Sequence, residues 1–250
     1  MSITVQIALA DFVDADHGRR ERELLPALHP VEQTRYRAFQ HARRRQIWLA
    51  GRELLLAALA RQRPRVDAAA LRSDARGAVR YDGDSVRISL SHSGNLLVAA
   101  LAPVPVGVDV EQSRPRACIR QAGRLFAHAE ARYLRTLTPA AIQTGFYMFW
   151  TLKEAFAKAA GMSLWEALQG AEFDLHAQCV HASPPAHWNC VHARTAYGPH
   201  LAVAVQSADN EVRLECRRRS TAGDWLAENL LERTTLRSAE SSSCFPAQVG

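Results

Sequence analysis

The sequence predicts an α+β fold made of two halves of similar size. The first observation is the order of elements, because a strand, helices and a pair of strands occur once before residue 102 and again after residue 105. The second is the segment APVP at 102–105, where proline restrains the chain and offers no donors to a sheet. The third is a strongly periodic apolar pattern over 43–60 and 139–161, which is typical of packed helices.

The first half is predicted to run from residue 1 to 104. Residues 2–10 are apolar and β-branched and favour a strand. Residues 32–40 and 43–60 are expected to be helical, and 64–84 is rich in turn residues. Two strands are expected at 86–91 and 96–101, around the Ser-Gly-Asn turn at 93–95.

The second half is predicted over 105–210 and a C-terminal extension over 211–250. The expected elements are a strand at 107–111, helices at 116–134 and 139–161, and strands at 190–195 and 200–206. Gly161 is a good candidate for a C-cap. In the extension, Trp225, Leu226, Leu230 and Leu231 form the apolar stripe of an amphipathic helix over 224–237. The Ser-rich residues 238–250 are expected to be disordered.

Charge and composition exclude several classes of protein. Lys and Arg number 31 and Asp and Glu 25, so the net charge is +6, which suits an anionic partner. No apolar run approaches the ~20 residues of a membrane span. No secretory signal opens the chain, so we expect a cytoplasmic protein without a membrane partner. The five cysteines form no CxxC pair and are expected to be reduced.

Lysine occurs only at Lys153 and Lys158. In a chain that otherwise uses arginine, this indicates that a compact ammonium group is needed there. On a helix, Glu154 and Lys158 lie one turn apart on the same stripe as Trp150. The alternative interpretation is a surface salt bridge, which contributes little.

The segment GVDVE at 107–111 places two carboxylates on one face of a strand. Asp109 and Glu111 can therefore share a divalent cation, and Mg²⁺ prefers one or two carboxylates together with water and substrate phosphates. The alternative is an edge strand with a wet acidic face.

The segment SLSHSG at 89–94 combines hydroxyls, an imidazole and a glycine turn, a set that can bind phosphate. A serine nucleophile is disfavoured, because no G-x-S-x-G elbow is present. A structural turn histidine stays an alternative. A zinc site at Cys179, His181, Cys190 and His192 is a further alternative, although their C-x-H spacing is unusual for zinc.

The motifs SHSG (91–94), GVDVE (107–111) and FWTLKEAFAKAAG (149–161) occur in the order found in one family. Together they resemble the 4′-phosphopantetheinyl transferases of the Sfp type. The resemblance covers about residues 30–206 and includes RLFAHAE at 124–130 and AGR at 50–52. It implies two halves related by a pseudo-twofold axis, each a small antiparallel sheet packed with helices, with the active site between them.

The resemblance also implies the chemistry. Such enzymes move phosphopantetheine from coenzyme A to a serine of an apo acyl or peptidyl carrier protein and release 3′,5′-ADP. The implied roles of this chain's residues are a Mg²⁺ site at Asp109, Glu111 and Glu154, catalytic roles for Lys153 and Glu130, and coenzyme A contacts from Arg35, Ser91, His92 and Lys158.

Two departures from the family leave contacts open. The family often has Gly-Lys/Arg-Pro before the SHS strand, where this chain has RGAVR at 76–80. Which of Arg43, Arg44 and Arg45 faces coenzyme A is also open, as is the natural carrier protein.

Two other functions remain as hypotheses. A catalytically silent protein that binds coenzyme A or a carrier is one, and the intact acidic trio argues against it. A basic nucleic-acid-binding module is the other, and no DNA-reading pattern supports it. We expect no nucleic-acid partner and a monomer, because two halves already supply both walls of a site.

Overall fold

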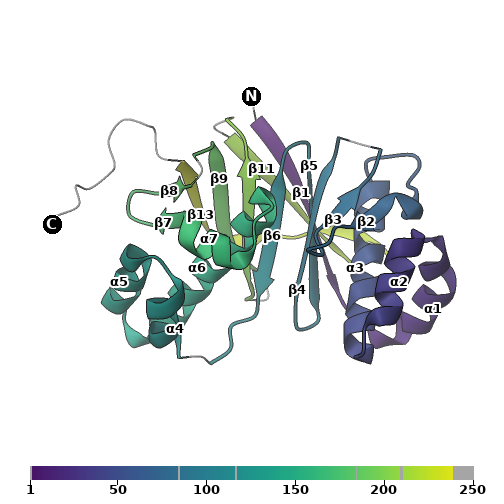
Figure 1. Ribbon diagram of the computed structural model, residues 1–250, viewed down its shortest axis with the longest axis horizontal. Helices are drawn as coiled ribbons and strands as arrows, with labels where there is room; N and C mark the ends of the chain where they lie inside the picture. The colour runs from purple at the N-terminus through teal and green to yellow at the C-terminus, as the bar shows by residue number, and fades with distance from the viewer. Residues whose placement is uncertain are drawn as a thin grey trace.

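The computed structural model describes residues 2–83, 85–115, 117–183, 185–196, 198–208 and 211–238. Two sheets lie back to back at the centre, and helices cover the outer face of each (Figure 1). The first sheet has the order β12 (Trp225–Ala227), β11 (Glu211–Arg219), β1 (Ser2–Asp11), β5 (Leu96–Ala102) and β4 (Arg87–Ser93). The second has the order β6 (Val106–Glu111), β10 (His200–Gln206), β9 (Trp188–Thr195), β13 (Leu230–Ser238), β8 (Cys179–Ala182) and β7 (Ala171–Asp174).

The helices divide between the two outer faces. On the first sheet lie α1 (His17–Glu23), α2 (Pro30–Ala38) and α3 (Ala42–Ala60), with the short turns η1 (Asp14–Asp16), η2 (Leu25–Ala27) and η3 (Ala68–Ala70). On the second lie α4 (Cys118–Leu125), α5 (His128–Thr136), α6 (Pro139–Ala160) and α7 (Leu164–Gly170). A separate hairpin of β2 (Leu71–Ser73) and β3 (Val79–Tyr81) precedes β4.

Strand alternation explains the layers. In β5, Val98 and Ala100 belong to the core between the sheets, whereas Leu97 and Leu101 belong to the core under α3. Because successive side chains point to opposite faces of a strand, an uninterrupted apolar run such as LLVAALA is what a strand buried on both faces requires.

The two halves share one strand order. In the first, β1 pairs antiparallel with β5, and β5 with β4. In the second, β6 pairs antiparallel with β10, and β10 with β9. Each half also has one long helix, α3 or α6, packed on its sheet. The predicted α+β class is confirmed, and the loop between β5 and β6 contains the predicted boundary at 104/105.

Most predicted elements occur with shifts of one or two residues. The long helix α6 ends at Ala160, and Gly161 adopts the left-handed conformation with φ of 66°. The single helix predicted over 116–134 is wrong, because it is divided between α4 and α5. The break lies at Phe126 and Ala127, where Glu130 accepts a hydrogen bond from the Ala127 amide and starts a new helix. Residue 116 lies outside the described residues.

The helix predicted over 224–237 is also wrong, because β12 and β13 occupy this segment. Leu226 and Leu231, which the helical pattern placed in an apolar stripe, are exposed, and Leu236 is fully buried. Pairing of β13 with β9 and β8 decides the conformation, and a sequence window does not contain these partners. Of the predicted disordered tail, Ser238 ends β13, and 239–250 lie outside the described residues.

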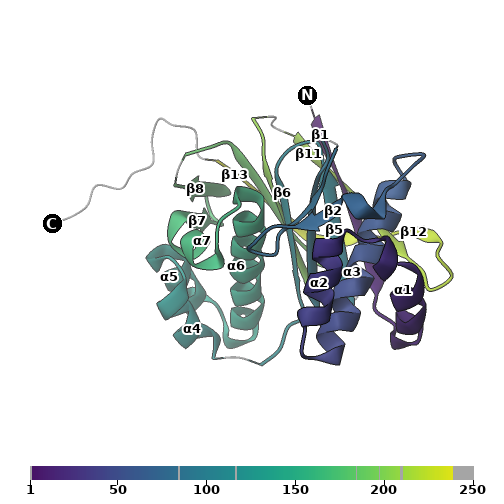
Figure 2. The ribbon, with the colours of Figure 1, turned by 45° about the vertical axis from the view of Figure 1, so that its right-hand side comes forward.

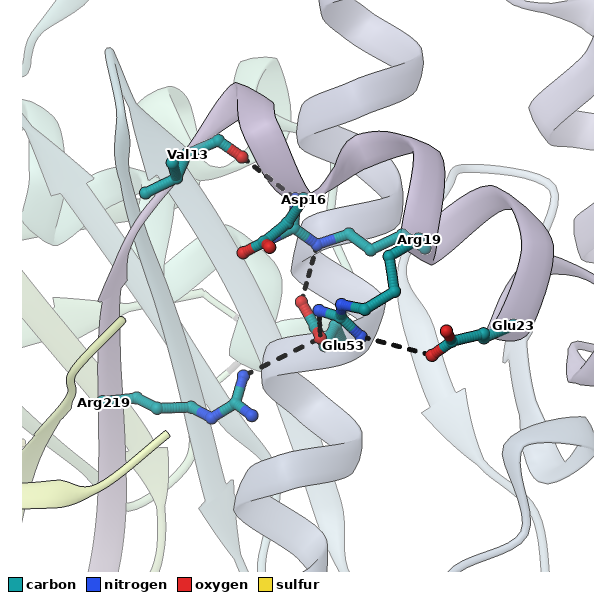
Figure 3. A network of polar contacts seen from close by, with 7 residues as sticks. Val13, Asp16, Arg19, Glu23, Glu53 and Arg219 are labelled. Carbon is teal, nitrogen blue, oxygen red and sulfur yellow. Dashed lines mark hydrogen bonds and ion pairs between the residues drawn. The ribbon is translucent and has the colours of Figure 1, made fainter. Parts of the chain in front are cut away.

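The C-terminal extension therefore joins both halves. Its strand β11 pairs in parallel with β1, and β13 completes the second sheet. A network of charges adds to this connection (Figure 3): Arg19 and Arg20 each contact the Glu53 carboxylate at 2.6 Å, and Arg219 of β11 approaches it to 3.9 Å.

Three serines connect the edges of the two sheets, and we call Ser89, Ser91 and Ser93 of β4 the serine ladder. The Ser89 hydroxyl accepts a hydrogen bond from the Val108 amide at 3.1 Å. Ser91 and Ser93 donate to the carboxylates of Asp109 and Glu111 at 2.7 and 2.8 Å. The ladder therefore satisfies polar groups of β6 that would otherwise lack partners at a buried edge.

Two negative findings concern the described residues. No helix among them is long and apolar enough to span a membrane. Among their cysteines, Cys190 and Cys216 are free thiols.

A buried histidine pair lies in the second sheet. His192 of β9 and His200 of β10 are 2.9 Å apart, between Nε2 and Nδ1. The His200 Nε2 atom lies 3.5 Å from the Arg194 guanidinium, which can only donate. His200 must then carry its proton on Nδ1 and donate to His192, which leaves the buried Nδ1–H of His192 without a hydrogen-bond partner in the described part of the chain. Burial is the main cause that lowers the pKa of His192 to about 4 and of His200 to about 3.

We predict from Gly107 that the contact between β6 and α6 tolerates no side chain. A Cβ atom there would lie 1.9 Å from the Ala155 carbonyl oxygen and 2.6 Å from the Ala159 amide, so backbone must move. Gly107→Ala should lower the free energy of unfolding in urea by about 1–3 kcal/mol. The control Gly123→Ala, in helix α4, should be neutral or stabilising, because a Cβ there would make an ordinary contact with the Arg135 side chain at 3.5 Å. Equal stability of both variants would contradict this packing.

We also predict an acid-sensitive stability. Both histidines have a lower pKa in the folded than in the unfolded state, so the unfolded state binds more protons as the pH falls below about 6.5. The free energy of unfolding should fall by about 1.4 kcal/mol per pH unit for each histidine between pH 6 and 4. When the free energy of unfolding in urea is plotted against pH over this range, the slope should be shallower for His200→Gln than for the wild type. The slope for His187→Gln should equal that of the wild type. The same slope in all three proteins would refute the assignment.

Candidate active site

The outer face of β6 carries the acidic residues toward helix α6. Asp109 and Glu111 alternate with the inward-facing valines of the strand, and Glu154 and Lys158 come from the facing helix. The Lys158 ammonium group donates to Asp109 Oδ1 at 2.8 Å and to the Val108 carbonyl at 3.0 Å. The absence of a side chain at Gly107 allows this close approach. The strand and helix motifs predicted from the sequence therefore meet in one place.

The electrostatics of this place favour a cation. Burial raises the pKa of Glu154, and the charges of Asp109 and Glu111 raise it further, against the effect of Lys158. Asp109 Oδ2 is buried and has no hydrogen-bond partner among the residues that the structure describes. Crowded carboxylates with an unsatisfied oxygen are the hard donors that Mg²⁺ accepts. Within the described ranges, however, no three His, Cys, Asp or Glu side chains are already gathered as a metal-binding group.

A cleft of about 290 Å³ lies next to this acidic face. Both halves line it: the hairpin, α3 and β4 from the first, and the end of α6 from the second. Its lining includes Arg52, Arg76, Gly77, Leu90, Lys158 and Met162. Three cations at the boundary of two halves make this the place for an anionic ligand.

The two residues predicted from the SHSG segment, Ser91 and His92, point to opposite sides of β4. Ser91 is buried and donates to Asp109, so it orients a carboxylate and does not face the cleft. His92 points the other way along the strand and is exposed. Partial burial and the positive charges of Lys158, Arg44 and Arg43 lower the pKa of His92, so the imidazole lies in a region of positive potential.

The predicted arginine contacts are partly resolved. Arg35 donates to the Asp74 carbonyl at 3.0 Å and holds the β2–β3 hairpin. Arg43 lies over the Phe12 ring and Arg44 over the Phe39 ring, at 4.4 and 4.9 Å from the ring centres. The positive charges of Arg43 and Arg44 contribute to the lowered pKa of His92, whereas the charge of Arg45 counteracts the raised pKa of Tyr36. The first two therefore lie on the His92 side of α3.

Lys153 and Glu130 lie together but apart from the acidic face. Their side chains form a 3.0 Å ion pair with 0% exposure at both ends. Lys153 also donates to the Ala171 carbonyl at 2.6 Å, and Glu130 accepts from the Phe173 and Ala127 amides. Burial lowers the pKa of Lys153 and raises that of Glu130, while the opposite charges counteract both shifts. Neither side chain reaches the cleft in this conformation.

Sequence reasoning missed a buried ion pair behind the cleft. Arg52 donates to Glu32 Oε2 from two nitrogens, at 3.1 and 3.0 Å, and to the Ser73 hydroxyl at 2.7 Å. It also stacks over Trp48, and burial lowers its pKa to about 10. This pair connects α2, α3 and the hairpin. The only signal in the sequence was the AGR step at 50–52, which belonged to the family resemblance.

The zinc alternative finds no support in the part of the chain that the structure describes. Cys179 lies 3.3 Å from His181, whereas His192 pairs with His200, which was not one of the four candidates. No group of three ligating side chains occurs among the described residues. These residues belong to the strands of the second sheet.

Comparison with known proteins bears on the same segments. A model of the 4′-phosphopantetheinyl transferase superfamily matches residues 105–205, which contain β6, α6 and the acidic face. A 4′-phosphopantetheinyl transferase of Bacillus subtilis is 35% identical over 79 residues, or 32% of this chain and 35% of the relative. HetI of Nostoc sp., a 4′-phosphopantetheinyl transferase, is 36% identical over 84 residues, or 33% of this chain and 35% of the relative.

A longer match extends over both halves. The 4′-phosphopantetheinyl transferase Sfp of Bacillus subtilis strain 168 is 25% identical over 207 residues, which is 79% of this chain and 90% of Sfp. The chain thus spans about a third of the length of the first two relatives and most of Sfp. The resemblance inferred from the motifs is confirmed, since residues 105–205 match the model of the 4′-phosphopantetheinyl transferase superfamily and the chain is similar to several proteins named 4′-phosphopantetheinyl transferase.

Proposed function

We propose that this protein transfers the 4′-phosphopantetheine arm of coenzyme A to a serine of an apo acyl or peptidyl carrier protein. The observation that carries the proposal is the cleft between the halves, which Lys158 lines next to the carboxylates of Asp109, Glu111 and Glu154. The names of the relatives support the same reaction. The order β1–β5–β4 and β6–β10–β9 supports a pseudo-twofold relation of the halves.

The reaction needs position and charge more than covalent catalysis. The carrier serine oxygen bonds to the phosphorus that bears pantetheine, and the bond from that phosphorus to the bridging oxygen breaks. The electron pair leaves with 3′,5′-ADP, and the serine proton passes to a base. Negative charge therefore grows on the bridging oxygen, next to which a fixed cation is most useful.

Lys158 is the residue that the geometry favours for this cation. Its ammonium group lies at the cleft, is partly exposed and already binds an oxyanion, the Asp109 carboxylate. The positive charges of Arg43 and Arg44 near His92 would attract the phosphates of coenzyme A. We propose that Arg35 acts indirectly, through the hairpin that it holds.

Asp109, Glu111 and Glu154 would hold Mg²⁺, which supplies neutralisation of the pyrophosphate charge when bound. The orphaned Asp109 Oδ2 atom and the mutual repulsion at Glu154 support this assignment. Ser91 and Ser93 would fix the orientation of two of these carboxylates. We propose that the protein acts as a monomer, since one chain supplies both walls of the cleft.

For Lys153 and Glu130 we propose positioning roles. Their buried pair connects α6, the start of α5 and the start of β7, and so sets how α6 presents Glu154 and Lys158 to β6. This departs from the direct catalytic roles implied by the family resemblance. The support is that both side chains are fully enclosed.

Intact-protein mass spectrometry tests the reaction. Apo acyl and peptidyl carrier proteins, incubated with the protein, coenzyme A and Mg²⁺, should gain one phosphopantetheine arm. EDTA should abolish the gain, and Asp109→Asn should slow it by about 100-fold or more, because a catalytic metal contributes several kcal/mol. The control Asp82→Asn removes an exposed carboxylate that pairs with Arg72 and should leave the rate unchanged. Full activity of Asp109→Asn would contradict the proposal.

The two lysines should behave differently. Lys158→Gln should lose transfer by more than about ten-fold with a smaller loss of stability than Lys153→Met, since the Lys158 side chain is partly exposed and the glutamine amide can still donate to Asp109. Lys153→Met leaves Glu130 as a buried charge without its ion-pair partner and should lower the free energy of unfolding by about 3–5 kcal/mol. The double variant Glu130→Gln with Lys153→Met should recover part of that stability. If Lys153→Met loses transfer with unchanged stability, Lys153 contacts the substrate and the positioning role is wrong.

A further inference from the structure

Arg76 joins the two halves across the mouth of the cleft. It lies in the hairpin loop between β2 and β3, which reaches from the first half toward the upper end of α6 (Figure 2). Its guanidinium donates to the Gly161 carbonyl at 2.7 Å and lies 4.0 Å from the Glu166 carboxylate. The same side chain lines the cleft. One cation therefore contacts the second half at the place where an anionic ligand would enter.

The loop that carries Arg76 is held firmly on its own side. The Asp74 carbonyl accepts hydrogen bonds from Arg35 and from the Gly77 amide, and the Asp74 carboxylate accepts one from the Ala78 amide. Gly77 has φ of 93°, and a Cβ there would lie 2.9 Å from Arg35. These hydrogen bonds order the backbone of the loop, and its contact with Gly161 and Glu166 is made by the Arg76 side chain.

The groups of the second half that Arg76 contacts are polar, and the contacts are weak. Gly161 ends α6, so its carbonyl belongs to the negative end of that helix. Glu166 caps α7 by accepting from the Ser163 amide. The side chains of Arg76 and Glu166 are 65% and 56% exposed. An exposed ion pair of this kind shifts an equilibrium by no more than about five-fold.

A second arginine that lines the cleft, Arg52, differs from Arg76 in its burial and its partners. Arg52 also lines it but is buried and bound to Glu32 and Ser73. It cannot change partners without leaving a buried carboxylate unpaired. A phosphate group offers arginine two charge-assisted hydrogen bonds, which are stronger than one bond to a carbonyl and a distant carboxylate. Arg76 is therefore the arginine of the cleft lining that is able to exchange its protein contacts for a ligand.

We infer that Arg76 is a latch. Without ligand it closes the mouth of the cleft through Gly161 and Glu166, and with ligand it releases them and binds a phosphate of the incoming nucleotide. This inference rests on the proposed function, since coenzyme A is the anionic ligand. It makes Glu166 a competitor of the ligand, so removal of the Glu166 charge should strengthen binding, although Glu166 itself does not line the cleft.

The latch itself can be tested without ligand. Hydrogen–deuterium exchange of the free protein should be faster over residues 74–78 in Arg76→Ala and, to a smaller extent, in Glu166→Gln. The glutamine oxygen can still accept from the Ser163 amide, so the cap of α7 is kept. Arg72→Gln, which removes an exposed ion pair with Asp82 of the same hairpin region, is the matched control and should not change the exchange at 74–78. Unchanged exchange in both latch variants would overturn the inference.

The exchange of partners is tested by calorimetric titration with coenzyme A. Glu166→Gln should bind about two- to five-fold more tightly than the wild type. Arg76→Ala should bind about ten-fold more weakly. The double variant should match Arg76→Ala, because Glu166 acts only through Arg76. Equal tightening by Glu166→Gln with and without Arg76 would overturn the latch. A wild type that does not bind coenzyme A would overturn the proposed function, and with it the ligand part of the latch, whatever the exchange shows.

Discussion

The hydrogen bonds of the serine ladder join the two halves and also shape the site. Ser89 satisfies a backbone amide of β6, and Ser91 and Ser93 orient Asp109 and Glu111. An edge strand with unpaired amides is ordinarily a liability, which proteins cover or pair. Here the serine side chains of edge strand β4 form hydrogen bonds with polar groups of edge strand β6. The boundary between the sheets is therefore also the place where the carboxylates of Asp109 and Glu111 are oriented. The cleft exists because two complete sheets meet through side chains and do not merge into one ladder.

The charged groups near the cleft are of two kinds, enclosed ion pairs and solvent-exposed cations. Glu32 with Arg52 and Glu130 with Lys153 are enclosed pairs whose hydrogen bonds are satisfied, one behind each wall of the cleft. Breaking such a pair is costly, so each wall is stiff. Lys158 and Arg76 line the cleft and keep contact with solvent, and His92 is exposed, so these groups are able to exchange partners. Stiff walls with adaptable cations between them suit a ligand that carries several phosphates.

Local patterns predicted much of this molecule. The strands around residues 98 and 108, helix α6 and its cap at Gly161 followed from periodicity and turn residues, whereas the grouping of GVDVE with Glu154 and Lys158 was implied by the family resemblance. Long-range pairing escaped prediction: β13 is a strand because β8 and β9 lie beside it. Side-chain direction escaped it too. Lys153 and Glu154 are neighbours in sequence, yet they point to different sides of α6, one into the core and one toward β6. The contact of Arg76 with Gly161 joins residues 85 positions apart, beyond any local pattern.

The most direct test of the central claim is a crystal structure with coenzyme A and Mg²⁺ bound. The account predicts the pyrophosphate between β6 and α6, with the metal on Asp109, Glu111 and Glu154. Lys158 would then have turned from Asp109 to a phosphate oxygen, and the serine ladder would be unchanged. A nucleotide bound elsewhere, or one bound in the cleft with Lys158 still paired to Asp109 and no metal on the carboxylates, would contradict the account.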